Sequence, residues 1–330
     1  MSHTVAPPTV APPTVAERLS SALWGPLLMH NAERIARLLR HAPSLRPESL
    51  GVAVETGGRY GPLPEHRFDV YRPVNAGAAL PLAIYIHGGG FQFFDRRTHW
   101  AMATEIARRG YVVVTIDYRL APRHRFPAAV QDAALAYRYV ADHAEALGAD
   151  PTRLLLAGES AGANLVLGLA IARCWRHDAP HARDVWDAPM HPTVLLPACG
   201  YLQVSDPGRH GRHQRLSRVI DARVHAVSRS YLPAHTPALP SHAFANPLAM
   251  VEAAAAPERR FPATYALVGS VDPVVTDTLR LGAALARLDV DHEVAVYPGH
   301  GHTFHALTFT EPGRRAWAEQ MAFAARSGSQ

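Results

Sequence analysis

The stretch Leu154-Leu-Leu-Ala-Gly-Glu-Ser160-Ala-Gly-Ala-Asn-Leu165 decides the fold of this chain. Its first four residues are apolar and indicate the end of a buried strand, and the run from Ala163 to Arg173 indicates a helix. A serine between small residues at a strand-to-helix turn is typical of a nucleophile elbow, because the sharp turn exposes the hydroxyl. The free amides at the start of the helix also favour negative charge beside Ser160. An ordinary Gly-Ser turn is the alternative for the five-residue pattern alone, so the prediction depends on this context.

Short strand-like runs alternate with helical runs along most of the chain. The predicted strands are 67–71, 80–86, 111–116, 153–157, 193–196, 263–268 and 293–297. Strands separated by helices predict an α/β fold with a mostly parallel central sheet flanked by helices. Ligands of such sheets bind beyond the carboxyl ends of the strands, which is where Ser160 lies in this prediction.

Three segments do not follow this alternation. Residues 1–16 contain a proline-rich five-residue repeat, which predicts a disordered arm. Residues 17–50 have apolar positions at three- and four-residue spacing and predict N-terminal cap helices, or helices that only pack on the domain. Residues 201–245 are rich in His, Arg, Pro and Ser and predict a cap insertion with a helix over 217–231. The catalytic core then comprises residues 51–200 and 246–330.

The composition makes several classes of protein improbable. The chain has 330 residues, of which 48% are hydrophobic, and this is enough to bury one large core. The 33 basic residues are all scattered arginines and the net charge is only +5, so we expect no nucleic-acid partner. No apolar run reaches the roughly 18 residues of a membrane span, so we expect no membrane span and a cytoplasmic location. Cys174 and Cys199 are too few for a disulfide framework.

Three consecutive glycines follow the predicted strand 80–86, in His87-Gly-Gly-Gly-Phe91. Such a run has a large entropic cost, and it is explained where backbone amides approach a ligand closely, as in an oxyanion hole. A plain glycine-rich turn is the alternative. A phosphate loop is disfavoured because the run has neither a Gly-Lys-Ser/Thr ending nor the spaced glycines of a dinucleotide site.

A nucleophilic serine needs a histidine as its base, and the histidine needs an acid that fixes its tautomer. The chain order serine, acid, histidine restricts the search to the C-terminal part, where Asp272 and His302 each follow a predicted strand. Asp277, His300 and His305 are nearby competitors. His300-x-His302-x-x-His305 could also be metal ligands, but the spacing completes no zinc motif. We therefore expect no metal and no organic cofactor.

Together these motifs resemble the hormone-sensitive lipase family, which includes the microbial family IV carboxylesterases and has the α/β-hydrolase fold. The resemblance covers about residues 55 to 310. Its most specific stretches are His87-Gly-Gly-Gly-Phe91, the run 117–130, Gly158-Glu-Ser-Ala-Gly-Ala-Asn-Leu165, Asp272-Pro273 and Tyr297-Pro-Gly-His-Gly-His302. The family usually has a glycine at the position of Thr303, so this departure leaves the orientation of His302 open.

The resemblance implies a role for each matching residue. Ser160 is the expected nucleophile, His302 the general base and acid, and Asp272 its partner. The expected oxyanion hole consists of the amides of Gly89, Gly90 and Ala161. We expect Phe91, Phe93 and Phe94 to enclose the substrate.

The implied activity is hydrolysis of short- to medium-chain carboxylic esters through an acyl-enzyme, under a helical cap. The alternatives are an amidase, formamidase or acyltransferase with the same triad, and a non-catalytic small-molecule receptor. A small-molecule ester is the expected partner, and a homodimer is a further expectation because family members are often dimers. Asp117 and Arg119 are expected to form ion pairs or anchor a loop, and Glu159 to support the elbow or tune the pocket.

Overall fold

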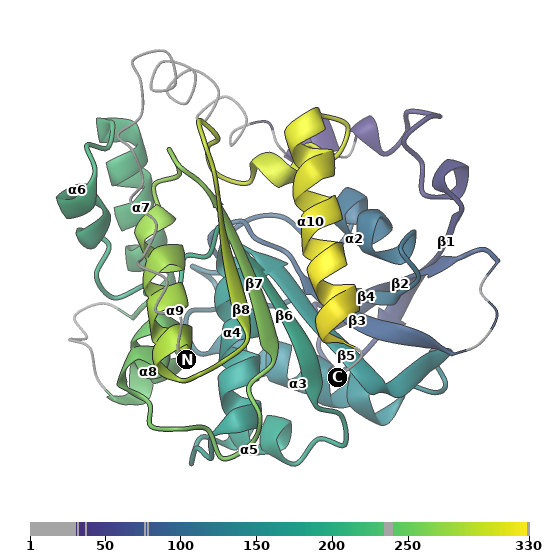
Figure 1. Cartoon of the computed structure of the whole chain (residues 1–330), viewed down its shortest axis with the longest axis horizontal. Helices are drawn as coiled ribbons and strands as arrows, with labels where there is room; N and C mark the ends of the chain where they lie inside the picture. Colours follow the sequence, from purple (N-terminus) through teal and green to yellow (C-terminus); the bar gives the residue numbers. More distant parts are fainter. Residues whose placement is uncertain are drawn as a thin grey trace, which may run out of the picture.

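The sheet has eight strands in the order β1-β2-β4-β3-β5-β6-β7-β8 (Figure 1). This computed structural model describes residues 31–328 except 32, 37, 76, 78 and 234–239. The strands are β1 (Val52–Arg59), β2 (Arg67–Pro73), β3 (Leu80–Ile86), β4 (Val112–Ile116), β5 (Ala149–Glu159), β6 (Pro192–Ala198), β7 (Ala263–Gly269) and β8 (His292–Tyr297). Strands β3 to β8 are paired in parallel, and β1 and β2 form an antiparallel edge. The predicted mostly parallel sheet is confirmed.

Each of the seven predicted runs matches a strand of this sheet, with Tyr111 of the run 111–116 lying just before β4. The eighth strand, β1, was not predicted. In β1 only Val52 is buried, and most of the other side chains are exposed. Two neighbouring glycines, at 57 and 58, coincide with a register shift against β2. An edge strand with a bulge lacks the apolar alternation on which the prediction depends.

Helices cover both faces of the sheet, as predicted. α2 (Trp100–Ala107) and α10 (Glu311–Ser327) pack on one face, and α10 crosses in front of the strands in Figure 1. The other face is covered by α3 (Ala128–Asp142), α4 (Ala161–Cys174), α5 (Pro180–Trp186), α8 (Pro247–Ala253) and α9 (Val275–Arg287). The central strands are consequently buried on both sides, and all five residues of β4 are buried.

The predicted insertion 201–245 contains α6 (Arg209–His213), α7 (Arg218–Tyr231) and part of a short 3-10 helix, η2 (Pro240–Ala245). α7 begins as predicted, because the Ser217 hydroxyl accepts a hydrogen bond from the Ile220 amide at 3.3 Å. Two further 3-10 helices are η1 (Glu48–Leu50) and η3 (Phe304–Ala306).

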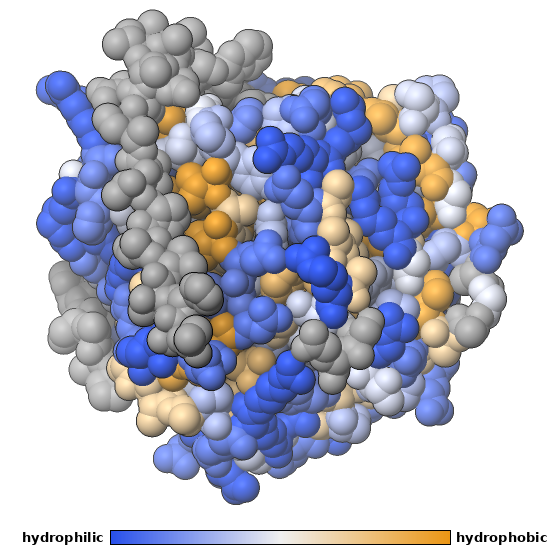
Figure 2. Space-filling view, viewed as in Figure 1, coloured by the Kyte–Doolittle hydropathy of each residue, from blue (hydrophilic) through white to orange (hydrophobic). Residues whose placement is uncertain are grey.

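The predicted arm 1–16 and residues 17–30 of the predicted N-terminal cap lie outside the described residues. The described part of that cap packs on the α2 and α10 face, where Trp100 Nε1 donates to the Ala36 carbonyl at 3.0 Å. None of the described helices is long and apolar enough to cross a membrane. Figure 2 shows a mostly hydrophilic face with small apolar patches.

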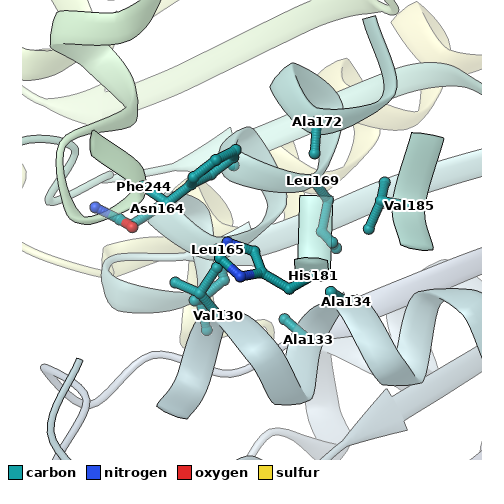
Figure 3. Close-up of a pocket in the computed structure, with 11 residues that line it drawn as sticks. Val130, Ala133, Ala134, Asn164, Leu165, Leu169, Ala172, His181, Val185 and Phe244 are labelled. Carbon is teal, nitrogen blue, oxygen red and sulfur yellow. The ribbon is translucent and has the colours of Figure 1, made fainter. Parts of the chain in front are cut away.

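A small cavity lies between α3, α4 and α5 (Figure 3). Its lining is mostly apolar and includes Val130, Leu165, Leu169 and Phe244. None of the three residues predicted to form the triad lines it, so the cavity belongs to the packing of the core.

Candidate active site

Ser160 occupies the turn between β5 and α4 with φ 52° and ψ −112°, a conformation that non-glycine residues rarely adopt. Its amide donates to the Ala198 carbonyl at 2.9 Å, which ties the turn to β6. A Cβ on Gly162 would lie 2.0 Å from the Ile86 carbonyl oxygen, so no side chain fits there. The small residues of the sequence pattern therefore allow a close approach of backbones and hold the serine in a strained turn.

The structure brings the three predicted triad side chains together from loops after β5, β7 and β8. His302 Nε2 lies 3.0 Å from Ser160 Oγ. His302 Nδ1 lies 3.0 Å and 2.9 Å from the two carboxylate oxygens of Asp272. Asp272 is fully buried, and one of its oxygens also accepts the Val274 amide at 2.9 Å. The Val274 amide thus holds in place the carboxylate that orients the imidazole.

The electrostatic environment of His302 favours the protonated imidazole. Burial lowers the pKa of His302, but the charge of Asp272 and its hydrogen bond outweigh burial and raise the pKa above 6.5. Thr303, where the resemblance predicts glycine, adopts left-handed backbone angles of φ 56° and ψ 27°. The threonine therefore reproduces a conformation that glycine adopts without strain, and His302 still reaches Ser160.

Asp277, the competing acid, has other partners. It is fully buried, and its Oδ1 accepts a hydrogen bond from Arg209 Nε of α6 at 2.9 Å. Its second oxygen accepts the Leu202 amide at 2.9 Å. Asp277 therefore links the first turn of α9 to the insertion and does not contact His302.

The other two histidines of the 300–305 segment have different surroundings. His300 stacks on Phe304 with ring centroids 4.8 Å apart, and His305 Nε2 lies 3.5 Å from the Glu159 carboxylate. Among the described residues, only Cys199, Asp272 and His302 form a group close enough to share a metal ion. The alternative of three metal-binding histidines thus has no geometric support in the described chain.

The glycine run forms a tight loop beside Ser160. Gly89 has φ 99°, and a Cβ there would lie 2.3 Å from the Phe93 carbonyl oxygen. Tyr118 Oη donates to the carbonyls of His87 and Gly88, at 3.0 and 3.2 Å, and so anchors the start of the loop. Tyr118 lies in the charged motif 117–130, but nothing in its sequence position indicated this role.

The amides of Gly89, Gly90 and Ala161 are available to a ligand. Within the described part of the chain, no backbone or side-chain oxygen accepts a hydrogen bond from any of them. Ala161 is the first residue of α4, where amides lack helical partners. Free amides beside a nucleophile are what an oxyanion requires.

The three predicted substrate-enclosing phenylalanines differ in exposure. Phe91 is fully buried and stacks on Tyr231 of α7 with ring centroids 3.8 Å apart, so its ring packs between the loop and α7. Phe93 is 43% exposed and lies beneath the Arg223 guanidinium. Phe94 packs on Gly89 and meets His99 edge-on. Phe93 and Phe94 remain the candidates for substrate contact.

Asp117 and Arg119 of the motif 117–130 form ion pairs, as the sequence predicts. Asp117 pairs with Arg96, which also lies 2.9 Å from Asp69. Arg119 pairs with the buried Asp132 at 2.7 Å. Both residues therefore anchor loops at the carboxyl edge of the sheet.

Several proteins of similar sequence or structure are named as esterases. A family described as having the α/β hydrolase fold matches residues 83–306. Esterase LipI of Mycobacterium tuberculosis is 31% identical over 271 residues, which cover 79% of this chain and 78% of LipI. Carboxylesterase NlhH of the same organism is 40% identical over 130 residues, 39% of this chain and 40% of NlhH.

Among solved structures, esterase LipW from Mycobacterium marinum superposes with a TM-score of 0.74 at 26% identity, covering 98% of this chain and 99% of LipW. The sheet order, the elbow and the family match agree with one another. The chain therefore belongs to the α/β-hydrolase-fold family, and within it to the hormone-sensitive lipase type.

Proposed function

We propose that this protein is a serine carboxylesterase in which Ser160 is the nucleophile, His302 the base and Asp272 the acid. The observation that carries the proposal is the chain of hydrogen bonds from Ser160 Oγ through His302 to Asp272. Relatives named carboxylesterase, esterase and ethyl acetate hydrolase support the choice of esters.

Each step of the proposed reaction is assigned to a side chain or backbone amide of this site. His302 Nε2 takes the proton of Ser160 as Oγ attacks the ester carbonyl, and Asp272 stabilises the imidazolium that forms. The amides of Gly89, Gly90 and Ala161 receive the oxyanion. His302 then returns the proton to the departing alcohol, which leaves an acyl-enzyme. Water, deprotonated by the same imidazole, hydrolyses the acyl-enzyme and frees the acid.

The insertion is proposed to act as a cap that limits the acyl chain to short or medium length. A Cβ on Gly90 would lie 2.9 Å from Val227 of α7, so this helix lies directly over the proposed oxyanion loop. Gln214, after α6, donates to the Asp272 carbonyl at 2.8 Å. The insertion thus contacts both the oxyanion loop and the acid loop.

The direct test is the Ser160→Ala variant. Loss of the nucleophile is expected to lower kcat for p-nitrophenyl esters by on the order of a millionfold. A fluorophosphonate probe is expected to label the wild-type protein at Ser160 and to leave the variant unlabelled. Near-normal hydrolysis by the variant would refute the proposal.

A substrate panel separates the related activities. Rates over p-nitrophenyl esters of increasing chain length are expected to peak at short or medium acyl groups. Anilides with the same acyl groups should react far more slowly, and added alcohols should not become the main acceptor. Faster cleavage of the anilides, or dominant transfer to alcohols, would reassign the enzyme to an amidase or an acyltransferase.

A further inference from the structure

The proposed mechanism leaves one buried carboxylate at the site unused. Glu159 immediately precedes Ser160 and is 4% exposed. Its Oε1 lies 2.8 Å from His99 Nε2, and its Oε2 lies 3.5 Å from His305 Nε2. Burying a charge is costly unless partners compensate it, so this carboxylate needs an explanation.

Glu159 touches each of the three segments that make up the proposed active site. It belongs to the elbow itself. A Cβ on Gly88 would lie 2.9 Å from Glu159 Oε1, so the carboxylate lies directly against the oxyanion loop. His305 belongs to η3, three residues beyond His302. One side chain therefore connects the nucleophile, the oxyanion loop and the loop of the base.

The hydrogen bonds of His99 show how the carboxylate is compensated. His99 Nδ1 lies 2.9 Å from Thr98 Oγ1, and the Thr98 hydroxyl donates its own proton to the Asp95 carbonyl at 2.7 Å. A carboxylate only accepts hydrogen bonds, so His99 Nε2 is the donor to Glu159. His99 and Glu159 are thus buried hydrogen-bond partners at the N-terminal side of α2.

The carboxylate remains charged at neutral pH. Burial would raise the pKa of Glu159, but the charge of His99 and its hydrogen bond outweigh burial and lower the pKa to about 2. Burial lowers the pKa of His305 to about 4, so the His305 ring beside the carboxylate is neutral at neutral pH. The other titratable groups around Glu159 are His302, His87, Tyr85, Tyr118 and Cys199. After Asp272, Glu159 is the second acid that raises the pKa of His302.

We infer that Glu159 is a positioning residue of the esterase, which holds the three loops together and stabilises the protonated form of His302 by its charge. This inference rests on the proposed roles of Ser160 and His302. The two groups that set the protonation of His302 are then Asp272, by direct contact, and Glu159, by its charge across the cluster.

The test is the pH profile of kcat/KM for Glu159→Gln, because free enzyme is active only with neutral His302. Without the carboxylate charge, the pKa of His302 falls. The acid limb of the profile is expected to shift to lower pH by about half a unit or more, and the plateau to fall about tenfold. Glu159→Asp keeps the charge on a shorter side chain, and its acid limb is expected between those of the wild type and Glu159→Gln.

Asp132→Asn is the matched control. Asp132 is 1% exposed and contacts His66 at 3.1 Å and Arg119 at 2.7 Å, so it is a buried carboxylate between a histidine and a cation. It does not contact the triad. This variant is expected to lower the melting temperature and leave the acid limb in place.

Different experimental results would overturn the inference about Glu159 and the proposed function. A folded Glu159→Gln protein that is labelled at Ser160 and keeps the wild-type acid limb would overturn the inference alone. If Glu159→Gln does not fold, an acid limb of Glu159→Asp identical to that of the wild type has the same meaning. Wild-type protein that is neither labelled at Ser160 nor active on esters would instead refute the proposed function.

Discussion

Two buried aspartates follow β7, Asp272 in the loop and Asp277 in the first turn of α9. They have different partners, and the difference separates catalysis from stability. Asp272→Asn is expected to lower kcat by about ten-thousandfold, because the amide no longer selects the productive tautomer of His302. Asp277→Asn leaves Arg209 buried beside a neutral amide and is expected to cost about 3 kcal/mol of unfolding free energy.

Ester hydrolysis and urea unfolding of both variants measure the two effects. The folded Asp277→Asn enzyme is expected to keep kcat within a few-fold of the wild type. A severe loss of kcat in Asp277→Asn together with a nearly normal Asp272→Asn enzyme would reassign the acid of the triad.

The raised pKa of His302 sets the low-pH limit of activity. Protonated His302 cannot accept the Ser160 proton, so kcat/KM is expected to fall as the pH drops through the pKa of the free enzyme. Because Asp272 raises that pKa, the midpoint of the fall should lie above 6.5. Hydrolysis of a neutral ester between pH 5 and 9 measures it. A midpoint at or below 6.5 would contradict the assigned environment of His302.

The triad could be predicted from the sequence because its order and its positions after strands are constrained by the fold. The contacts of Glu159 with His99 and His305 could not be predicted from the sequence. Twenty histidines are present, and only the folded chain shows that His99 and His305 reach this carboxylate. The same holds for Tyr118, whose hydroxyl reaches the oxyanion loop over thirty residues of chain.

At the scale of elements, α7 illustrates what the sequence predicts and what it omits. The predicted helix over 217–231 agrees with the observed bounds Arg218–Tyr231, which Ser217 caps. Its place in the fold depends on tertiary contacts. Tyr231 stacks on Phe91, and its carbonyl accepts the Phe126 amide at 2.9 Å. These contacts couple the end of α7 to the oxyanion loop and to the core.

Tyr231 provides a test of this coupling. Its ring is fully buried, and among the described residues its hydroxyl has no hydrogen-bond partner. Tyr231→Ala is expected to cost about 3 to 5 kcal/mol and to lower kcat/KM, because α7 loses its aromatic anchor. Tyr231→Phe keeps the stack and removes an unsatisfied hydroxyl, so stability should be unchanged or higher.

Urea unfolding of the two variants and ester hydrolysis give the comparison. A Tyr231→Phe protein as unstable as Tyr231→Ala would show that the hydroxyl, and not the stacked ring, holds α7 in place.

At the scale of the whole molecule, the alternation of strands and helices was sufficient to predict a mostly parallel sheet. Local patterns could not predict the order of the strands in the sheet. β4 follows β3 in the chain but lies between β2 and β3 in the sheet, and the antiparallel edge includes β1, which was not predicted. Whether residues 17–50 and 201–245 act as caps, whether the chain forms a homodimer and whether it is cytoplasmic stay predictions.

Several histidines are buried in the interior of the molecule and are neutral at pH 7. His87, His210 and His305 are 0 to 1% exposed. Burial lowers their pKa values to about 3, 4 and 4. Below pH 6.5 the unfolded chain binds protons at these positions that the folded chain does not bind, so stability falls as the pH drops from about 6.5 toward 4. His302 acts in the opposite direction, since its raised pKa adds stability below 6.5 that is lost as the pH rises through the folded value.

The lowered pKa values of His87, His210 and His305 outweigh the raised pKa of His302, so we expect the free energy of unfolding to be smaller at pH 5 than at pH 7. The difference should be about 1 to 2 kcal/mol for each buried neutral histidine. Urea unfolding at pH 7, 6 and 5 measures the slope. His210→Leu is the matched variant, because both ring nitrogens of His210 lack partners among the described residues. It should retain stability at pH 7 and lose less of it at pH 5. Equal stability of the wild type at pH 5 and 7 would show that these histidines are not held neutral by burial.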